Sequence, residues 1–397
     1  MPLLPTASVV VHTLRHALAG RATRAWRSAA HRERRLRVGV DIRPFYEPLT
    51  GVGWYLYYLL HELAKRDDVE LYLFGDARVT DDGPHLHADL PANAQLCTFD
   101  LRGRALSRLS RPVTAGAYVL WMELAGCDVF FGANYFLPRL HAAVARRRVV
   151  TVHDLTYKRF PELLQKETLE NLDRMMQREI AAADAIVCVS ESTRRDLLHY
   201  YDADPSRVHA VLSGLGTPAA AQPFEGLPPR YILFVSTIEP RKNLVTLIDA
   251  YERLRDSGAY DGSLVVVGKV GWKSESLVPR LRGRGIVHLD YVPAPQLATI
   301  YERAEAFVFP SIYEGFGFPL LEAMARGVPS VAARSSSLPE IGGDAALYFE
   351  PTDVAALTAQ LTRVLHDPAL RADLAERGRA RAAEFRWDDA AAKTLDV

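Results

Sequence analysis

Short runs of apolar residues recur along the chain and alternate with longer segments that mix apolar and polar residues. Apolar runs closed by polar or glycine-bearing loops are typical of strands buried in a parallel sheet, and the longer segments are typical of helices. Strands are expected at 36–42, 69–74, 128–131, 148–152 and 185–189, and then at 231–235, 264–267, 286–289, 306–310 and 328–332. Helices are expected at 54–64, about 163–182, from 244, from 295, at 320–325 and over most of the chain from 353, whereas 76–115 has no clear pattern.

This alternation starts twice, and a segment rich in glycine, proline and alanine separates the two series. Strands that alternate with helices indicate parallel sheets, and 397 residues suffice for two domains. The sequence therefore predicts an α/β protein with two doubly wound, Rossmann-like domains that face a central cleft. The expected parts are a basic arm at 1–36, an N-terminal domain at 37–216, a linker at 217–229, a C-terminal domain at 230–380 and a last helix at 381–397 that could pack back on the first domain.

Composition and charge narrow the class of protein. Hydrophobic residues make up 49% of the chain and charged residues 24%, as is typical of globular proteins. Lysine plus arginine equals aspartate plus glutamate, at 48 each, so the overall charge gives no indication of nucleic-acid binding. Cys97, Cys127 and Cys188 are far apart and form no CxxC pair, which disfavours a zinc site and a disulfide framework and favours the reducing cytosol.

Residues 1–36 depart from this charge balance, because their many arginines are opposed by only one acid, Glu33. Two interpretations stay open: a basic amphipathic arm on an anionic membrane surface, or a flexible leader. The charge follows the apolar stretch, the reverse of a secretory signal, and the sequence has no apolar run long enough to span a membrane. We therefore expect a cytoplasmic protein, either free or at the inner face of the membrane.

Two features of the first domain follow predicted strands. The loop after its first strand contains Gly51 and Gly53, whose lack of a Cβ atom would let the backbone approach a ligand closely. Leu56 stands where a dinucleotide fingerprint needs its third glycine, which disfavours nicotinamide binding. His153 follows a later strand and could bind a ligand or stabilise developing charge, although a purely structural histidine is the alternative.

In the second domain, candidate ligand-binding residues stand in two loops at the carboxyl ends of predicted strands, where open α/β sheets bind ligands. Arg241 and Lys242 follow the first strand and could hold a diphosphate, or they could form a solvated basic turn. The loop after the strand at 306–310 carries Glu314, and the helix after it is expected to place Glu322 in its first turn. The start of that helix offers backbone amides to an anion.

Several familiar catalytic patterns are absent from the sequence. It contains no Walker A motif, no HExxH zinc-protease motif and no GxSxG nucleophile motif. Glu314 and Glu322 could be considered as the acid and the nucleophile of a glycosidase. Because Glu322 is expected on a helix behind Glu314, it is difficult for both carboxylates to flank one bond, and roles in binding hydroxyl groups are favoured.

Taken together, these motifs resemble the retaining glycosyltransferases of family 4, which have the GT-B fold. The E-x7-E motif of that family corresponds to Glu314 and Glu322, with Gly315-Phe316-Gly317 between them. The resemblance extends over roughly residues 37–395 and is most similar to the branch that contains many mannosyl- and rhamnosyltransferases of bacterial surface polysaccharides. It also includes the segments Glu239-Pro240-Arg241-Lys242-Asn243, Val189-Ser190-Glu191-Ser192 and Leu338-Pro339-Glu340-Ile341.

The resemblance implies a role for each donor-binding residue of the second domain. Glu314 would bind hydroxyl groups of the donor sugar, Glu322 would accept hydrogen bonds from the nucleotide ribose, and Lys242 would bind phosphate. The backbone amides around Gly317, Phe318 and Leu320 would face the sugar and the phosphate.

The resemblance also covers the first domain. Gly51 and Gly53 match the glycine loop that lets phosphate or acceptor come close, and His153 matches a histidine beside the transferred sugar. Many family members carry an arginine five or six residues before the phosphate-binding lysine. Serine and threonine stand in that region here, and Arg241 could compensate for the missing charge.

The implied reaction needs neither a metal ion nor an organic cofactor. Preorganised cations and a helix start would stabilise the leaving diphosphate, and the acceptor hydroxyl would attack the front face of the sugar without an enzymic nucleophile. GDP-mannose is the favoured donor, and a glycan or lipid-linked acceptor is expected. Two rivals are a non-hydrolysing nucleotide-sugar epimerase and a catalytically inactive sugar-nucleotide-binding subunit. The presence of Glu314, Glu322 and Lys242 together disfavours the second rival.

Overall fold

The computed structural model describes residues 35–77, 79–80, 83–84, 86–100, 126–134, 145–163, 166–271, 273–274 and 277–397. The basic arm expected at 1–36 lies outside these ranges except for its last two residues, so both interpretations of it stay predictions. Within the described ranges, no helix is both long and apolar enough to cross a bilayer.

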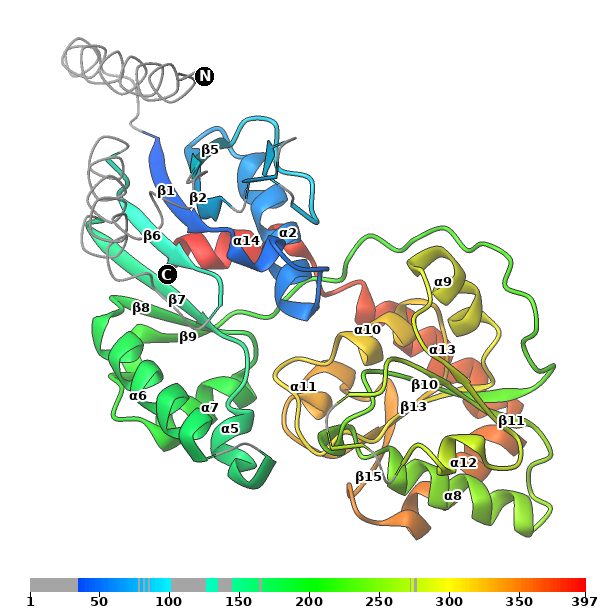
Figure 1. Ribbon diagram of the computed structural model, residues 1–397. Coiled ribbons are helices and arrows are strands. Elements are labelled where there is room, and N and C mark those ends of the chain that lie inside the picture. Colours follow the sequence, from blue (N-terminus) through cyan, green and yellow to red (C-terminus); the bar gives the residue numbers. More distant parts are fainter. Residues whose placement is uncertain are drawn as a thin grey trace, which may run out of the picture.

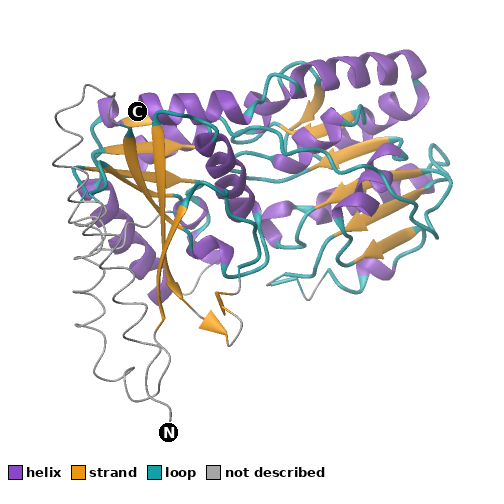
Figure 2. Cartoon of the chain, turned by 90° about the horizontal axis from the view of Figure 1, so that it is seen from above, coloured by secondary structure: helices purple, strands orange, loops and turns teal. Residues whose placement is uncertain are grey.

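Two parallel sheets with helices beside them form two domains (Figure 1). The first sheet has the strand order β5-β2-β1-β6-β7-β8-β9, and the second has the order β12-β11-β10-β13-β14-β15. In each sheet the chain moves outward from its first strand to one side and then to the other, as in doubly wound folds. Figure 2 shows the two sheets from above as separate sets of strands with helices beside them. The predicted fold class is confirmed.

Strand β1 (Leu36–Asp41) is at the centre of the first sheet and pairs in parallel with β2 (Val69–Ala77) and β6 (Val129–Gly132). A small antiparallel pair, β3 (Val79–Thr80) and β4 (Gly83–Pro84), lies outside this sheet. The other strands are β5 (Gln95–Asp100), β7 (Arg147–Val152), β8 (Ala185–Cys188) and β9 (Val208–Ala210). The helices are α2 (Gly51–Ala64), α5 (Thr156–Arg159), α6 (Lys166–Ala182) and α7 (Glu191–Tyr200).

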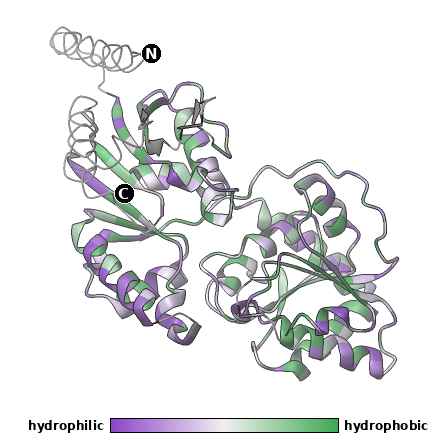
Figure 3. Ribbon diagram, in the orientation of Figure 1, coloured by the Kyte–Doolittle hydropathy of each residue, from purple (hydrophilic) through white to green (hydrophobic). Residues whose placement is uncertain are grey.

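The second sheet is built on β10 (Tyr231–Val235) and β13 (Ala306–Phe309), which pair with each other and are almost entirely buried. Hydrophobic colour follows these central strands in Figure 3. The other strands are β11 (Ser263–Val267), β12 (Ile286–Leu289), β14 (Ser330–Ala333) and β15 (Ala346–Phe349). The helices are α8 (Leu244–Asp256), α9 (Ala294–Glu302), α10 (Phe318–Ala325), α11 (Leu338–Gly342), α12 (Val354–His366), α13 (Pro368–Ala382) and α14 (Trp387–Asp396).

Besides the short pair β3 and β4, three strands of the two large sheets were not expected from the sequence: β5, β9 and β15. Each lies at the edge of its sheet. An edge strand pairs on one side only, so its sequence can carry more polar residues than a central strand. The polar residues of β5 and the shortness of β9 hide both strands within segments that look like loops.

Two expected helix starts differ from the structure by about one turn. Helix α2 begins at Gly51 and not at Trp54, so both glycines of the predicted loop lie in the first helical turn. Helix α6 begins at Lys166, because Leu163 belongs to a preceding 3-10 turn, η2 (Pro161–Leu163). Glycine has low helix propensity, and proline favours a break, so the sequence pattern shifts both boundaries by about one turn.

The chain crosses between the domains twice. Residues 211–230 form the first crossing and contain neither strand nor helix, and residues 383–386 form the second. The two crossings are joined where the backbone N–H of Leu215 donates to the carbonyl of Phe385 at 2.8 Å. After the second crossing, α14 packs against α2 of the first domain (Figure 1). The C-terminal helix thus belongs spatially to the N-terminal domain.

Candidate functional site

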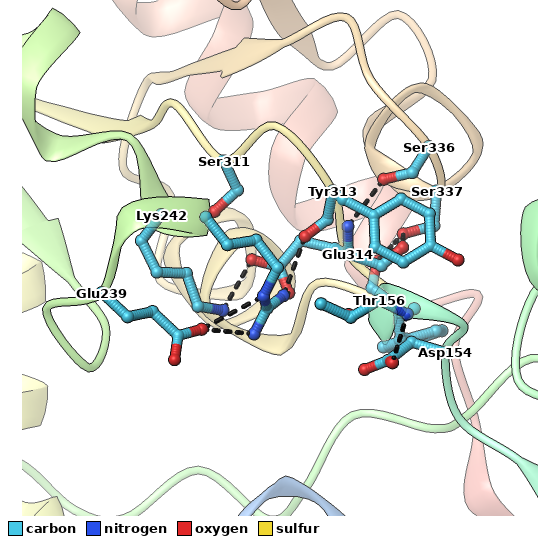
Figure 4. A network of polar contacts seen from close by, with 12 residues as sticks. Asp154, Thr156, Glu239, Lys242, Ser311, Tyr313, Glu314, Ser336 and Ser337 are labelled. Atoms are coloured by element: carbon cyan, nitrogen blue, oxygen red, sulfur yellow. Dashed lines mark hydrogen bonds and ion pairs between the residues drawn. The ribbon is translucent and has the colours of Figure 1, made fainter. Parts of the chain in front are cut away.

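The carboxylate of Glu314 stands at the centre of a buried charge network at the carboxyl edge of the second sheet. Its Oε1 accepts a hydrogen bond from Lys242 Nζ at 2.6 Å, and its Oε2 accepts one from Arg241 Nη1 at 2.9 Å. Figure 4 shows Lys242 on one side of Glu314 and Asp154 of the first domain on the other. The sequence-predicted residues Glu314, Lys242 and Arg241 are therefore brought together.

Glu314 is held in its ionised form. Burial opposes its charge, but Lys242 and Arg241 outweigh this effect and lower the pKa of Glu314 to about 2. Its backbone N–H also donates to Ser336 Oγ at 2.8 Å, and its carbonyl accepts from Ser337 Oγ at 3.1 Å. A fixed, charged carboxylate of this kind can accept hydrogen bonds from ligand hydroxyl groups.

Lys242 and Arg241 lie in a 3-10 turn, η4 (Pro240–Lys242), at the end of β10. The turn closes at Asn243, which has a left-handed conformation with φ 55°. Asn243 Nδ2 donates to the carbonyls of Pro310 and Pro351, at 3.0 Å and 2.6 Å. One asparagine side chain therefore ties the lysine turn to the loop that carries Glu314.

The two cations differ in how many of their donors the protein already uses. Arg241 donates to Glu239, to the carbonyl of Tyr313 and to Glu314, which occupies most of its five N–H groups. Beside Glu314 and Glu239, and in spite of its burial, the pKa of Arg241 is raised. Lys242 has three N–H groups, of which one is directed at Glu314. Lys242 is thus better able than Arg241 to bind an incoming anion.

The start of α10 offers fewer donors than the sequence suggested. Gly317, at the N-cap, has φ 118°, a conformation that glycine adopts readily. Pro319 has no N–H, and the N–H of Leu320 donates to the Gly317 carbonyl at 3.1 Å. The Leu320 amide is thus already bonded within this turn, and its expected contact with a ligand stays a prediction. Of the donors predicted at the start of α10, the amides of Gly317 and Phe318 are the ones that could still bind an anion.

Glu322 lies in the second turn of α10, not in the first as expected, because the helix begins at Phe318. Its carboxylate accepts a hydrogen bond from Tyr301 Oη at 3.2 Å. Burial raises the pKa of Glu322 to about 7, and the hydrogen bond from Tyr301 only partly offsets this. The surroundings of Glu314 therefore favour its charged form, whereas burial favours the protonated form of Glu322. This difference argues against equivalent roles for the two residues.

His153 of the first domain follows β7 and is held as a neutral imidazole. Its Nε2 lies 2.8 Å from the carbonyl of Ala133, so Nε2–H is the donor of that bond. Burial lowers the pKa of His153. The ring of Tyr55 meets the imidazole edge to face, with centroids 4.9 Å apart. Both the structural and the ligand-binding interpretation of His153 stay open, but a proton donated from Nε2 would first have to leave Ala133.

The two glycines at the start of α2 have different surroundings. A Cβ atom on Gly53 would lie 2.9 Å from Leu49 Cδ2, so a side chain here would require the Leu49 side chain to shift. Around a Cβ on Gly51 there would be no atom within 4 Å. Of the two, Gly51 is the one with open space beside it.

The domains meet next to Glu314 through contacts that the sequence did not predict. Tyr313 Oη donates to Asp196 at 2.8 Å and accepts from the N–H of Leu155 at 3.1 Å. The carboxylate of Glu340 accepts from the N–H groups of Glu191 and Ser192, at 2.9 Å and 3.2 Å. The motifs around Glu191 and Glu340 were visible in the sequence, but nothing in it indicated that they contact each other.

Within the described ranges, no group of three or more histidine, cysteine, aspartate or glutamate side chains is placed to hold a metal ion. The expectation of a metal-independent reaction stays a prediction.

Comparison with known proteins relates the two domains to two family descriptions. Residues 49–217 match "Glycosyltransferase Family 4", and residues 220–381 match "Glycosyl transferases group 1". Over 378 residues the chain is 32% identical to O-antigen chain mannosyltransferase B of Escherichia coli, covering 89% of this chain and 97% of that protein.

Two solved structures show the same arrangement of domains. Sucrose-phosphate synthase from Thermosynechococcus elongatus has a TM-score of 0.69 at 20% identity, over 91% of this chain and 98% of that one. HepE from Anabaena in complex with UDP-glucose has a TM-score of 0.65 at 17% identity, over 91% of this chain and 99% of that one. At these identities the likeness concerns the fold.

Proposed function

The chain belongs to glycosyltransferase family 4, and from this premise we propose that it transfers mannose from GDP-mannose to a glycan or lipid-linked acceptor, with retention at the anomeric carbon. That it is a glycosyltransferase follows from its family and from the mannosyltransferase relative. The donor, the stereochemistry and the acceptor are the proposed part. The name of the Escherichia coli relative supports mannose, and the UDP-glucose bound to the Anabaena protein supports a nucleotide-diphosphate sugar as the class of donor.

The observation that carries the proposal is the contact of Lys242 with Glu314 at the carboxyl edge of the second sheet. An ammonium group with further donors beside a carboxylate that is ionised at neutral pH suits a ligand that has both phosphates and hydroxyl groups. Lys242 would bind the diphosphate, and Glu314 would accept hydrogen bonds from the sugar. Arg241 would act mainly through Glu314, because most of its donors are already bonded within the protein.

The same geometry gives the reaction a physical basis. As the sugar–phosphate bond breaks, negative charge grows on the diphosphate, and a preorganised lysine next to a helix start stabilises that charge. The amides of Gly317 and Phe318 would add donors on the same side. The acceptor hydroxyl would approach from the first domain, where His153 lies against Tyr55.

A donor screen tests the proposal. The purified chain is incubated with GDP-mannose, UDP-glucose, UDP-N-acetylglucosamine or dTDP-rhamnose, and thermal stabilisation and donor hydrolysis are measured for each. We expect the largest stabilisation with GDP-mannose, and we expect Lys242→Met to abolish most of it. NMR of the transferred product would then show an α-linked mannose.

Three outcomes would contradict the proposal. Stabilisation by none of the four donors would remove the donor-binding role. A new sugar epimer formed without acceptor would favour the epimerase, and binding without any turnover would favour the inactive subunit.

A further inference from the structure

Three aromatic residues, Trp54, Tyr57 and Tyr58, form a row near the start of α2. The spacing i, i+3 and i+4 places them on one side of the helix. The ring of Trp54 is stacked on that of Tyr58, with centroids 5.8 Å apart and an interplanar angle of 26°. Trp54 is nevertheless 44% exposed, so much of its indole surface is open.

Tyr58, at one end of this row, is packed against the rest of the protein. Tyr58 is itself stacked on Trp387 of α14, with centroids 5.5 Å apart and an angle of 20°. Tyr58 also lies against Gly216, where a Cβ atom would stand 2.7 Å from its hydroxyl oxygen. The indole of Trp54 is therefore supported by a continuous aromatic stack, which limits its conformational freedom before any ligand binds.

Further aromatic contacts connect the row to His153. Tyr55, the residue after Trp54, contacts His153. Tyr58 is stacked on Trp387, and the ring of Trp387 also meets that of Tyr55, with centroids 5.7 Å apart. Beside Trp54, Gly51 has open space where a side chain would be. A molecule that reaches the sugar from the first domain would therefore pass close to the indole.

The charge around Trp54 indicates which class of molecule fits. The first ionisable side chain of α2 other than tyrosine is His61, two turns after Trp54, and α2 contains no lysine or arginine. A phosphate or an anionic lipid would find no cationic side chain on this helix. A neutral pyranose has C–H groups on its ring faces that can pack on an aromatic plane, and hydroxyl groups at its edge that stay hydrated.

We propose that Trp54 is an acceptor subsite, a stacking platform for a neutral pyranose ring of the acceptor glycan. The proposal rests on the glycosyltransfer proposed above and adds to it the residue that selects the acceptor. Trp54 would bind the acceptor, and would contact neither the donor nor the bond that breaks.

The test uses the whole chain with the donor that stabilises it most in the screen above. The acceptors are octyl glycosides of mannose, glucose, galactose and N-acetylglucosamine. The variants are Trp54→Ala, Trp54→Phe and, as a control, Leu96→Ala, which removes another exposed apolar side chain of the first domain, 38% exposed on an edge strand. Initial rates give KM for the acceptor, KM for the donor and kcat.

For Trp54→Ala we expect the KM of the best acceptor to rise at least about tenfold, the equivalent of about 1.4 kcal/mol. The KM of the donor and the rate of donor hydrolysis without acceptor should stay at the wild-type level. Trp54→Phe keeps an aromatic plane and should recover most of the loss, and Leu96→Ala should behave like the wild type.

An unchanged acceptor KM in Trp54→Ala would overturn the platform, and so would an equal rise in Leu96→Ala. A wild type that hydrolyses the donor but uses none of the four glycosides would overturn it as well. Binding to vesicles of phosphatidylglycerol and phosphatidylcholine that depends on Trp54, with acceptor KM unchanged, would show a membrane contact instead. Absence of donor binding and hydrolysis in the wild type would overturn the proposed function itself and is thus a separate result.

Discussion

Gly315 of the second domain packs so closely on His153 of the first that a Cβ atom at Gly315 would lie 1.8 Å from the His153 carbonyl oxygen. Such a distance is far below any van der Waals contact, so only glycine permits this approach. Gly315 follows Glu314 directly, and its own carbonyl accepts a hydrogen bond from Thr193 Oγ1 of the first domain at 3.3 Å. The loop that carries Glu314 is therefore pressed against the first domain.

Gly315→Ala should separate the domains without unfolding them. The added methyl group cannot fit against the His153 carbonyl, and a rigid-body opening relieves the clash more cheaply than a change within either sheet. We expect kcat to fall by about a hundredfold or more, because a displacement of the order of 1 Å at a reacting centre has effects of this size. Small-angle scattering should show a larger radius of gyration, while the melting temperature stays within a few degrees. Wild-type kcat in this variant would contradict the close-packing argument.

Lys242→Met should reduce turnover more than it reduces stability. Loss of a preorganised charge at the leaving group costs about 10²–10³-fold in kcat. The remaining partner Arg241 still neutralises Glu314, so the loss in free energy of unfolding should be about 1–3 kcal/mol.

The double variant Lys242→Met/Glu314→Gln is the matched control for stability. Because it removes the buried charge together with its partner, it should regain part of the lost free energy of unfolding and none of the activity. Denaturant unfolding and single-turnover kinetics measure the two effects. Normal turnover in Lys242→Met would refute the phosphate-binding role.

Glu340→Gln should weaken the contact between the domains. The Glu340 carboxylate accepts from two amides at the N-terminus of α7, where the helix dipole also favours a negative charge. A carboxamide can accept through one atom only. We expect the arrangement with the two domains in contact to be destabilised by about 0.5–2 kcal/mol. The value of kcat should fall several-fold, with little change in donor affinity.

Distances between spin labels on α6 and α8 would report this arrangement directly. Glu350→Gln, at an exposed acid of the same domain, is the control and should leave the distances unchanged. Equal distance distributions in Glu340→Gln and wild type would show that Glu340 does not hold the domains together.

The fold could be predicted from the sequence because its central strands, such as β10 and β13, are short uninterrupted apolar runs. A strand that is buried on both faces of a sheet consists almost entirely of apolar residues. Edge strands such as β5 and β15 do not have this constraint. Likewise, the low helix propensity of Gly51 and Gly53 conceals that they are helical, since tertiary packing decides the boundary.

The candidate site could be predicted only in part. Glu314, Lys242 and Arg241 were found from their places after strands, and the structure joins them. The sequence could not show that Arg241 donates to Glu239, nor that the Leu320 amide donates to the Gly317 carbonyl, because both are local hydrogen bonds. Contacts between the domains, such as that of Tyr313 with Asp196, produce no periodic pattern in the sequence.

Glu322 supplies a prediction on pH. In the folded protein burial raises the pKa of Glu322 to about 7, above its ordinary value of 4.5. Between these two values the folded state keeps a proton that the unfolded state has lost, so the free energy of unfolding contributed by Glu322 falls as pH rises through this window. The loss should total roughly 2–4 kcal/mol and be complete just above pH 7. Urea unfolding of wild type and Glu322→Gln from pH 4.5 to 8 measures it as a difference between the two.

Donor binding should respond in the opposite direction. If ribose hydroxyl groups donate to Glu322, they select the ionised carboxylate, so nucleotide binding must displace the proton. The dissociation constant for the nucleotide should then fall as pH rises from 6 to 7.5 and level off above, whereas that of Glu322→Gln should stay nearly constant. Calorimetry in two buffers of different ionisation enthalpy should show release of about half a proton at pH 7. Binding that is independent of pH and releases no proton would mean that the ribose does not meet this carboxylate.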